Sequence, residues 1–281
     1  MPELPEVETT KNALSKIIKN AKVIKVEIFN NNLRWKVSDD ISTSLKNVVL
    51  EKPIRLGKYI LIPTDSKKSI LIHLGMSGSL KIEKNFSVLI KHDHVKLTLL
   101  NKEKEIFYII YNDPRRFGFI DLIPTSKLKS HFLLSKIGMD PFNKKFNKNY
   151  LLKKFKNRNI TIKSALMNQT IIAGIGNIYA SEILFLSKIH PLIKVHLINI
   201  ETIKLLVYFV KYVLKAAIKT GGTTIRNFKS PDGKLGYFKQ KLFVYGRAGD
   251  NCLICDSIIK LLIINKRSSF ICEKCQGTIK N

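Results

Sequence analysis

Residues 252–275, CLICDSIIKLLIINKRSSFICEKC, contain the pattern that most narrows the fold of this chain. The only four cysteines of the 281 residues lie here, spaced C-x2-C-x16-C-x2-C: Cys252, Cys255, Cys272 and Cys275. Each C-x2-C pair can bring two thiolates to one ion from a tight turn, and two pairs complete the closed tetrahedral site that zinc prefers. The spacing therefore predicts one structural Zn2+ ion, and we rank two disulfides or an iron–sulfur cluster below it.

The segment between the cysteine pairs predicts a β-hairpin. Its sequence, SIIKLLIINKRSSFI, has two apolar runs that turn at Asn265, Lys266 and Arg267. A bound metal would stiffen this hairpin and place Arg267 near its tip. Arg267 is one of only eight arginines in the chain. An arginine at the tip of a metal-braced hairpin indicates a nucleic-acid contact more than ordinary exposed surface.

The chain is strongly basic, with 49 Lys and Arg against 21 Asp and Glu and a formal net charge of +28. Charge of this sign and size indicates a polyanionic partner, either nucleic acid or an anionic membrane surface. The chain is also rich in Ile, Asn and Lys, which AT-rich coding produces by drift, so part of the charge is solvated surface without a specific task. Apolar residues make up 45% of the chain, enough for a core, and the length favours about two domains.

No stretch of the sequence predicts a membrane span. The most apolar helical stretch, residues 197–219, is interrupted by Glu201, Lys204, Lys211 and Lys215, and its apolar residues recur at helical spacing. The first residues carry acidic side chains where a signal peptide needs basic ones. We therefore expect a cytoplasmic protein without a membrane partner.

The order of patterns along the chain favours an α+β fold. Residues 3–19 have helical spacing, and residues 22–124 consist of short β-type runs separated by turn residues, as in an antiparallel sandwich. A polar segment at 125–150 marks a domain boundary, and helical pieces follow it. Residues 220–240 lose the helical periodicity and are rich in Gly, Ser, Asp and Pro, which indicates a long loop; loops of this length are usually functional or disordered.

The N-terminal stretch MPELPEVETT concentrates acidic residues, at positions 3, 6 and 8, in a basic chain. Removal of Met1 would leave Pro2 as a terminal secondary amine beside Glu3 and Glu6. A second motif, AGIGNIYASE, is interpreted as a Gly-hinged turn that feeds a helix with Asn177 near its cap, because no βαβ unit supports a dinucleotide fingerprint. Such a helix terminus favours an anion, although a simple helix connector is an equally good interpretation.

Three further motifs carry candidate residues with weaker signals. YNDPRRFGFI places Arg115 and Phe117 in a turn, and HLGMSGS places Met76 in another. Apolar side chains beside Arg suit a wedge in a base stack, but the residues alone favour an ordinary loop with Phe117 packed into the sandwich. KHDHVKL places His92 and His94 on one face of a predicted strand, where surface or phosphate-facing histidines are favoured over a metal site. Lys58, in RLGKYIL, is by itself an ordinary strand-end lysine.

Taken in order, these motifs resemble the bacterial formamidopyrimidine-DNA glycosylase family. They are MPELPEVE, RLGKY, HLGMSGSL, KHDHV, NDPRRFG, LMNQTIIAGIGNIYASEILF, GGTT…DG…GYF, VYGRAG and the cysteine pairs, and they span essentially the whole chain. LPEVE favours this branch over the related endonuclease VIII group. The resemblance implies a catalytic β-sandwich domain at residues 2–125, a helix-two-turn-helix domain at 126–240 with a lesion-recognition loop at 220–240, and a zinc finger at 241–281.

The resemblance implies a bifunctional enzyme of base excision repair. It would act as a monomer on damaged double-stranded DNA, associated with the nucleoid, excising oxidised purines such as 8-oxoguanine and formamidopyrimidines and then cleaving the abasic strand by β,δ-elimination. One alternative is an endonuclease VIII-type glycosylase that acts on oxidised pyrimidines. The other is a non-catalytic zinc-dependent nucleic-acid-binding protein, which leaves Pro2 and Glu3 at the terminus unexplained.

The matching positions imply a role for each candidate residue. Pro2 would be the nucleophile, Glu3 its acid/base partner, and Glu6 a group that orients the terminus. Lys58 would be an assisting base or a phosphate contact, and Arg267 would support the second elimination. The gap left by the flipped nucleotide would be filled by Met76, Arg115 and Phe117. The DNA backbone would be contacted by His92, Arg158, Asn177 and Arg226.

The chain departs from the family pattern at four of its positions. Arg158 and Arg226 stand where relatives commonly carry Lys, which keeps the charge and puts only the local geometry in doubt. Asn168 stands where Asp is usual, and Asp256 where Gly commonly follows the second cysteine. Neither of these two touches the implied chemistry.

Overall fold

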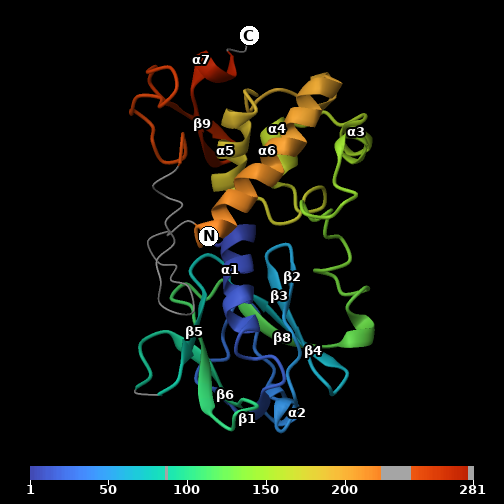
Figure 1. The fold of residues 1–281 in the computed structure, drawn as a ribbon, viewed down its shortest axis with the longest axis vertical. Helices are drawn as coiled ribbons and strands as arrows, with labels where there is room; N and C mark the ends of the chain where they lie inside the picture. Colours follow the sequence, from blue (N-terminus) through green and yellow to red (C-terminus); the bar gives the residue numbers. More distant parts are fainter. Residues whose placement is uncertain (86–87, 223–241, 278–281) are drawn as a thin grey trace. The chain divides into compact units, whose positions relative to one another are not determined.

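The computed structural model describes residues 1–85, 88–222 and 242–277 (Figure 1). The chain divides into two compact units. Residues 1–135 and 220–222 belong to the first unit, and residues 136–219 and 242–277 to the second. The helical segment and the cysteine segment thus share a unit, and the finer division at 125 and 240 stays a prediction.

The strands of the first unit form two antiparallel sheets of four strands each. The first sheet has the order β1 (Lys22–Ile28), β6 (Asp93–Leu100), β7 (Ile106–Asn112) and β5 (Ser79–Glu83). The second has the order β2 (Ile54–Leu56), β3 (Tyr59–Pro63), β4 (Lys68–His73) and β8 (Phe119–Pro124). The single-turn helix η1 (Thr125–Lys127) follows β8.

One apolar core joins the two sheets, which confirms the predicted β-sandwich. Val95 and Ile109 from the first sheet belong to the same buried cluster as Ile60 and Ile72 from the second. The short helix α2 (Ile41–Leu45) adds its two terminal side chains to this cluster. Each large aliphatic side chain buried in this way contributes roughly 1.5–3 kcal/mol by leaving water.

The N-terminal helix α1 spans Leu4–Ser15, and its first turn is capped by its own side chains. The Glu6 carboxylate accepts the backbone N–H of Glu3 at 2.8 Å, as in a capping box. Val7 and Leu14 enter the sandwich core. The helix ends four residues earlier than the predicted residue 19, because the N–H groups of Lys16 and Ile17 bond three residues back and tighten the last turn.

The second unit contains the predicted helices. They are α3 (Lys148–Phe155), α4 (Ile162–Met167), α5 (Asn177–Leu186), the single-turn η2 (Val195–Leu197) and α6 (Ile200–Lys219). Asn147 and Thr161 cap α3 and α4 by accepting backbone N–H groups three residues on. The buried side chains of α6 share one face, as the spacing predicted. Among the described residues, none of the helices has the length and apolar character needed to cross a membrane.

The cysteine segment of the second unit contains a hairpin, β9 (Lys260–Ile264) and β10 (Arg267–Ile271), and a short helix α7 (Glu273–Gln276). The hairpin turns at Asn265 and Lys266 alone, both with positive φ. The predicted three-residue turn is therefore wrong by one position, because Arg267 pairs with Ile264 as the first residue of β10. Two residues at positive φ form the turn that matches the natural twist of a hairpin.

A buried carboxylate connects α5 to the start of the cysteine segment. Glu182 is 1% exposed and accepts the backbone N–H groups of Phe243, Val244 and Tyr245 at 2.8, 3.0 and 2.8 Å. Burial raises the pKa of Glu182, and these three donors oppose that rise. Without such donors a carboxyl could not remain buried among the apolar side chains of α5.

We expect Glu182→Gln to destabilise the second unit by about 1–3 kcal/mol, because an amide nitrogen would face at least one backbone N–H that now donates to an oxygen. Urea unfolding of the purified protein measures this change. Glu201→Gln is the matched control, since Glu201 is exposed and its ion pair is with Lys204, one turn away on the same helix. Equal stability of the two variants would contradict the anchoring role of Glu182.

Candidate active site

The N-terminal residues lie buried at the start of α1. Pro2 is buried, and Glu3 and Glu6 are 1% and 0% exposed. The capping bond between Glu6 and the Glu3 backbone determines the direction in which the chain enters the helix. A salt bridge of 2.6 Å from Arg55 of β2 to Glu8 of α1 holds this helix against the second sheet. The sequence pattern thus builds a rigid support for the chain terminus.

Lys58 occupies the tight turn between β2 and β3, after Gly57. Gly57 has φ +61, a left-handed conformation that glycine adopts at little cost. Lys58 is only 8% exposed, which is unusual for a lysine in a turn. The sequence motif by itself indicates an ordinary lysine at a strand end. In the structure Lys58 is buried, and its charge acts on the chain terminus.

The charges around the terminal amine show that these residues form one group. Burial lowers the pKa of the Met1 amine, Glu3 and Glu6 oppose this effect, and Lys58 and Arg115 add to it. Two side chains near the terminus, Glu3 and Glu6, and two that are distant in sequence, Lys58 and Arg115, thus act on the same nitrogen. An amine with a lowered pKa is uncharged, and hence nucleophilic, at lower pH than an ordinary chain terminus.

Gly222 brings the beginning of the predicted 220–240 loop to this group. A Cβ at this position would lie 2.9 Å from Oε1 of Glu6, and the residue has φ +81. Only a glycine can bring its backbone this close to the carboxylate in this conformation. The rest of that predicted lesion-recognition loop, with Arg226, lies outside the described residues.

His73, at the end of β4, is a neighbour of Lys58 that the sequence analysis did not single out. Burial, together with the positive charges of Lys58 and Arg34, lowers the pKa of His73 to about 4. Its Nδ1 accepts the N–H of Gly75 at 3.0 Å, which requires the neutral ring. The histidine therefore supports the turn that carries Met76 without adding charge beside Lys58.

The turns that carry Met76 and Phe117 both present apolar side chains to solvent. Met76 is 40% exposed and Phe117 is 44% exposed. The guanidinium carbon of Arg115 lies 4.7 Å from the centre of the Phe117 ring, as in a cation–π pair. The interpretation in which Phe117 packs into the sandwich is wrong, because Gly118 and Phe119 enter the buried region in its place.

Asp113 joins these two turns and is fully buried. Its carboxylate accepts the Ser77 hydroxyl at 2.5 Å from one turn and the Gly118 N–H at 2.8 Å from the other. The Ser77 oxygen in turn accepts the N–H of Arg115 at 3.1 Å. Asp113 thus sets the position of Met76 relative to Arg115 and Phe117.

The two histidines of KHDHVKL have different surroundings. His94 lies in β6, is 3% exposed, and its Nε2 is 2.8 Å from the Asp113 carbonyl oxygen, which requires Nε2 to donate. His92 precedes the strand, has φ +74 and is half-buried. Only His94 lies in the strand, because β6 begins at Asp93, but the rings of His92 and His94 are neighbours, with their centres 6.4 Å apart. Only His92 remains a candidate for contact with a ligand.

In the second unit, Asn177 is the first residue of α5, as the Gly-hinged turn predicted. Its Nδ2 donates to the Ser268 carbonyl oxygen at 2.9 Å, while its Oδ1 is buried without a hydrogen-bond partner among the described residues. Arg158 is exposed in the connection between α3 and α4. Two candidate anion contacts therefore lie in this unit, one at a helix start and one in a loop.

Lys163 fastens the hairpin that carries Arg267. It is 2% exposed, and its Nζ donates to the Ser268 carbonyl oxygen at 2.9 Å and to the Ser269 hydroxyl at 2.5 Å. Ser268 thus receives hydrogen bonds from both Lys163 and Asn177. These hydrogen bonds hold the backbone of β10 at Ser268, the residue after Arg267. The exposed Arg267 side chain therefore extends from a backbone that is held in place.

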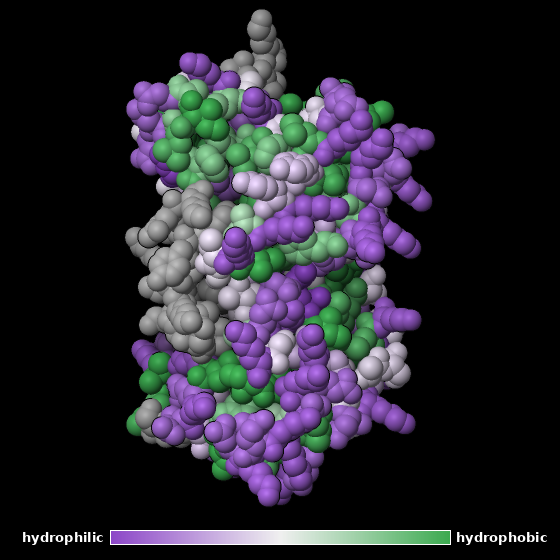
Figure 2. Space-filling view, in the orientation of Figure 1, coloured by the Kyte–Doolittle hydropathy of each residue, from purple (hydrophilic) through white to green (hydrophobic). Residues whose placement is uncertain are grey.

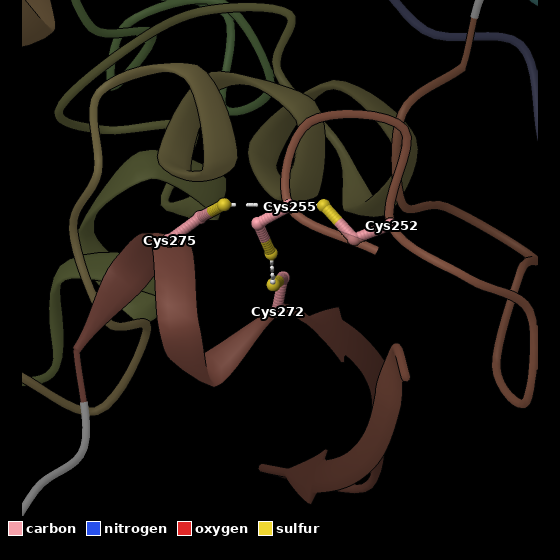
Figure 3. Close-up of side chains that lie close together, drawn as sticks. All are labelled: Cys252, Cys255, Cys272 and Cys275. Carbon is pink, nitrogen blue, oxygen red and sulfur yellow. Dashed lines mark hydrogen bonds between the residues drawn. The ribbon is translucent and has the colours of Figure 1, made fainter. Parts of the chain in front are cut away.

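The four cysteines gather as their spacing predicted (Figure 3). Their sulfur atoms all lie within 4.8 Å of one another, and Cys255 and Cys272 Sγ are 3.3 Å apart. Four thiols at these distances fit a single metal ion, which would neutralise their mutual repulsion when ionised. Phe185 of α5 packs against Cys252 and Cys272, so the cluster is part of the apolar core of this unit.

Two of the departures from the family pattern have a local explanation. Asp256 has φ +61, the conformation for which glycine is favoured after the second cysteine, and its carboxylate accepts from Asn251 at 2.9 Å. Asn168 ends α4, and its side-chain oxygen accepts the Thr170 N–H at 2.9 Å. Both replacements are short polar side chains that bond to nearby groups.

The motifs of the sequence did not single out three positioning residues, Asp113, Lys163 and Glu182, because all three are buried and lie outside the candidate reactive groups. Each had a signal in the sequence. Asp113 follows the strongly apolar run IFYIIY, Lys163 interrupts TIKSALM, and Glu182 interrupts YASEILF. A single charge within an apolar run is a sign of a buried and fully bonded group.

Comparison with known proteins gives matches to two family models. Residues 1–120 match the model described as formamidopyrimidine-DNA glycosylase N-terminal domain. Residues 137–229 match the model described as formamidopyrimidine-DNA glycosylase H2TH domain. Together the two matches cover most of the chain.

Relatives and solved structures agree with these matches. The formamidopyrimidine-DNA glycosylase of Hydrogenovibrio crunogenus is 42% identical over 276 residues, 98% of this chain and 96% of that protein. The one from Rickettsia bellii is also 42% identical over 276 residues, 98% of this chain and 99% of its own length. The Lactococcus lactis protein in complex with N7-benzyl-Fapy-dG DNA has a TM-score of 0.89 and 31% identity, covering 99% of this chain and 100% of that one. Its complex with abasic-site DNA also gives a TM-score of 0.89 at 31% identity, covering 98% of this chain and all of that one.

We expect Asp113→Asn to destabilise the first unit by about 1–3 kcal/mol, because the amide cannot accept from both Ser77 and Gly118 at their present positions. Thermal unfolding measures this effect. Asp39→Asn is the matched control and should leave stability unchanged, since Asp39 is exposed and its ion pair with Lys36 is a surface pair. If the two variants unfold alike, the two turns are not held together by Asp113.

Proposed function

The chain belongs to the formamidopyrimidine-DNA glycosylase family, and from this we propose that it excises oxidised purines from damaged double-stranded DNA and then cleaves the abasic strand. The observation that carries the proposal is the buried N-terminus, where Pro2 and Glu3 are buried and the charge of Lys58 acts on the adjacent Met1 amine. The Lactococcus lactis relative has been solved with Fapy-dG DNA and with abasic DNA, which supports DNA as the partner.

Pro2 is the proposed nucleophile, once Met1 has been removed. Its secondary amine attacks C1′ of the damaged nucleotide, forming a C–N bond as the glycosidic bond breaks and the base leaves with that electron pair and a proton. After the sugar ring opens, the adduct is an iminium cation that has no N–H proton to lose. The cation acidifies the 2′ hydrogen, and its loss expels the 3′ phosphate.

The protein's contribution is to keep the amine uncharged and to move protons near it. Burial lowers the pKa of the amine at Met1, and we propose that the Pro2 amine experiences the same environment. Glu3 is the proposed group that protonates the ring oxygen, and Glu6 orients the terminus through the backbone of Glu3. Lys58 is the proposed assisting base or phosphate contact.

The exposed turns supply the proposed contacts with the distorted duplex. Extruding a nucleotide leaves a gap, and Met76, Phe117 and Arg115 have the apolar surface and hydrogen-bond donors to fill it. The proposed DNA backbone contacts are His92 in the first unit, Arg158 and Asn177 in the second, and Arg226 outside the described residues. Arg267, at the start of β10, is proposed to support the second elimination.

Zinc is the proposed occupant of the four-cysteine cluster. Cys252, Cys255, Cys272 and Cys275 would hold the ion with four thiolates, which leaves no open coordination position for the reaction. The ion would therefore stabilise the hairpin that carries Arg267. We also propose that the protein acts as a monomer and is located at the nucleoid.

Borohydride should trap a covalent adduct between the protein and a duplex containing 8-oxoguanine, and mass spectrometry should map the adduct to Pro2. Glu3→Gln should lower the trapping rate by about 10²–10⁴-fold, the usual contribution of a general acid. Glu103→Gln is the control and should leave the trapping rate unchanged, because Glu103 is exposed in the turn between β6 and β7.

Two results would contradict this mechanism. The first is an absence of adduct from protein shown to begin at Pro2, and the second is an adduct that maps to Lys58. Excision compared on 8-oxoguanine and thymine glycol duplexes separates the proposed activity from that of an endonuclease VIII-type enzyme, which would prefer thymine glycol.

We expect one zinc ion per chain by elemental analysis, and its loss in Cys275→Ser. Loss of the metal should unfold the hairpin and weaken binding to abasic-analogue DNA, because binding energy at such sites is also folding energy. Lys274→Ser, at the neighbouring exposed position, should keep the metal. Stoichiometric iron in place of zinc, or full DNA binding without metal, would contradict the structural zinc assignment.

A further inference from the structure

A cavity of about 510 Å³ opens within the second unit. Its lining comes from the C-terminal half of α3, the residues that follow α3, the η2 turn and the first turn of α6. The volume lies within the range of about 300–1,000 Å³ typical of ligand sites. No step of the proposed glycosylase mechanism uses this cavity.

The floor of the cavity is apolar. Phe155, Val195 and Ile203 are 2%, 1% and 1% exposed, and Leu152 and Ile198 are half-buried beside them. None of these five side chains can donate or accept a hydrogen bond. An occupant must therefore place an apolar group on this floor, because a polar group there would lose its water without gaining a partner.

The rim of the cavity is basic and polar. Lys153 and Lys156 are exposed on one side, with Asn157 beside them and His196 from η2 completing the lining. Among the nine described residues that line the cavity, none is acidic. Figure 2 shows hydrophilic side chains over the part of the visible face where α3 lies. The rim therefore favours an anionic group next to the apolar floor.

The walls are held in place by the backbone. Lys156 N–H donates to the Leu152 carbonyl oxygen at 3.0 Å, and Val195 N–H donates to the carbonyl oxygen of Ile160 at 3.0 Å. His196 Nδ1 lies 3.1 Å from the Arg158 carbonyl oxygen, which can only accept, so Nδ1 carries the hydrogen. These bonds connect both sides of the cavity and preorganise it for binding.

We propose that this cavity binds an acidic peptide segment of a partner protein, with one bulky apolar side chain on the floor and carboxylates beside Lys153 and Lys156. A nucleotide would satisfy the basic rim, but its base would place ring nitrogens and carbonyl oxygens against side chains that cannot bond to them. An aliphatic or phenyl group suits Phe155 and Ile203 without this penalty. The proposal goes beyond the glycosylase function and does not rest on it.

Fluorescence anisotropy of the full-length protein with a labelled peptide of four aspartates followed by leucine and phenylalanine tests the proposal. We expect saturable binding that weakens at least ten-fold in the double variant Lys153→Glu, Lys156→Glu. The matched control is Lys144→Glu, Lys145→Glu, which changes the net charge equally at exposed positions outside the cavity and should weaken binding less than three-fold. Thermal unfolding of both variants verifies that they fold.

The apolar floor requires its own test, because any acidic peptide is attracted to a protein with a net charge of +28. A peptide with serines in place of leucine and phenylalanine should bind at least ten-fold more weakly, and adenosine monophosphate should not displace the original peptide. Equal binding of the two peptides, equal loss in both double variants, or displacement by the nucleotide would overturn the proposal. The titration contains no DNA, so its outcome is independent of the glycosylase test.

Discussion

The first unit is organised around one constraint, which is the burial of a terminal amine together with two carboxylates in a protein of net charge +28. Burial lowers the pKa of that amine, and the two nearby carboxylates, Glu3 and Glu6, oppose the effect. The carboxylates can remain buried because α1 uses one of them as its cap, and because Arg55 ties the helix to β2 through Glu8. Helix capping, sheet packing and the proposed chemistry therefore depend on the same few residues.

Buried charged side chains position the exposed residues that would meet DNA. In the first unit, Asp113 hydrogen-bonds to both of the turns that carry Met76 and Phe117. In the second unit, Lys163 hydrogen-bonds to the hairpin and Glu182 to the start of the cysteine segment. A buried charge is costly unless every bond it needs is made, so each of these groups tolerates only one local arrangement. The hydrogen bonds of these buried groups hold the backbone that carries flexible, exposed side chains such as Met76 and Arg267.

The cavity beside α3 differs from these sites because its polar and apolar parts are separated. Its floor belongs to the core of the helical segment, while its rim belongs to the charged surface. A site that combines charge with an apolar pocket is the kind of surface that distinguishes specific binding from general attraction.

The sequence by itself determined the sandwich, the helix that begins at Asn177, the amphipathic α6 and the four-cysteine cluster. These features follow from local periodicity, capping and ligand spacing, which act over a few residues. It did not reveal the burial of Lys58, the exposure of Phe117 or the separate surroundings of His92 and His94. Only the tertiary structure decided these, because the environment of a side chain depends on segments distant in sequence, as when Gly222 and Lys58 reach the terminus. The burial of an ionisable side chain in turn affects its pKa and its hydrogen bonds, and these determine which chemistry the side chain can perform.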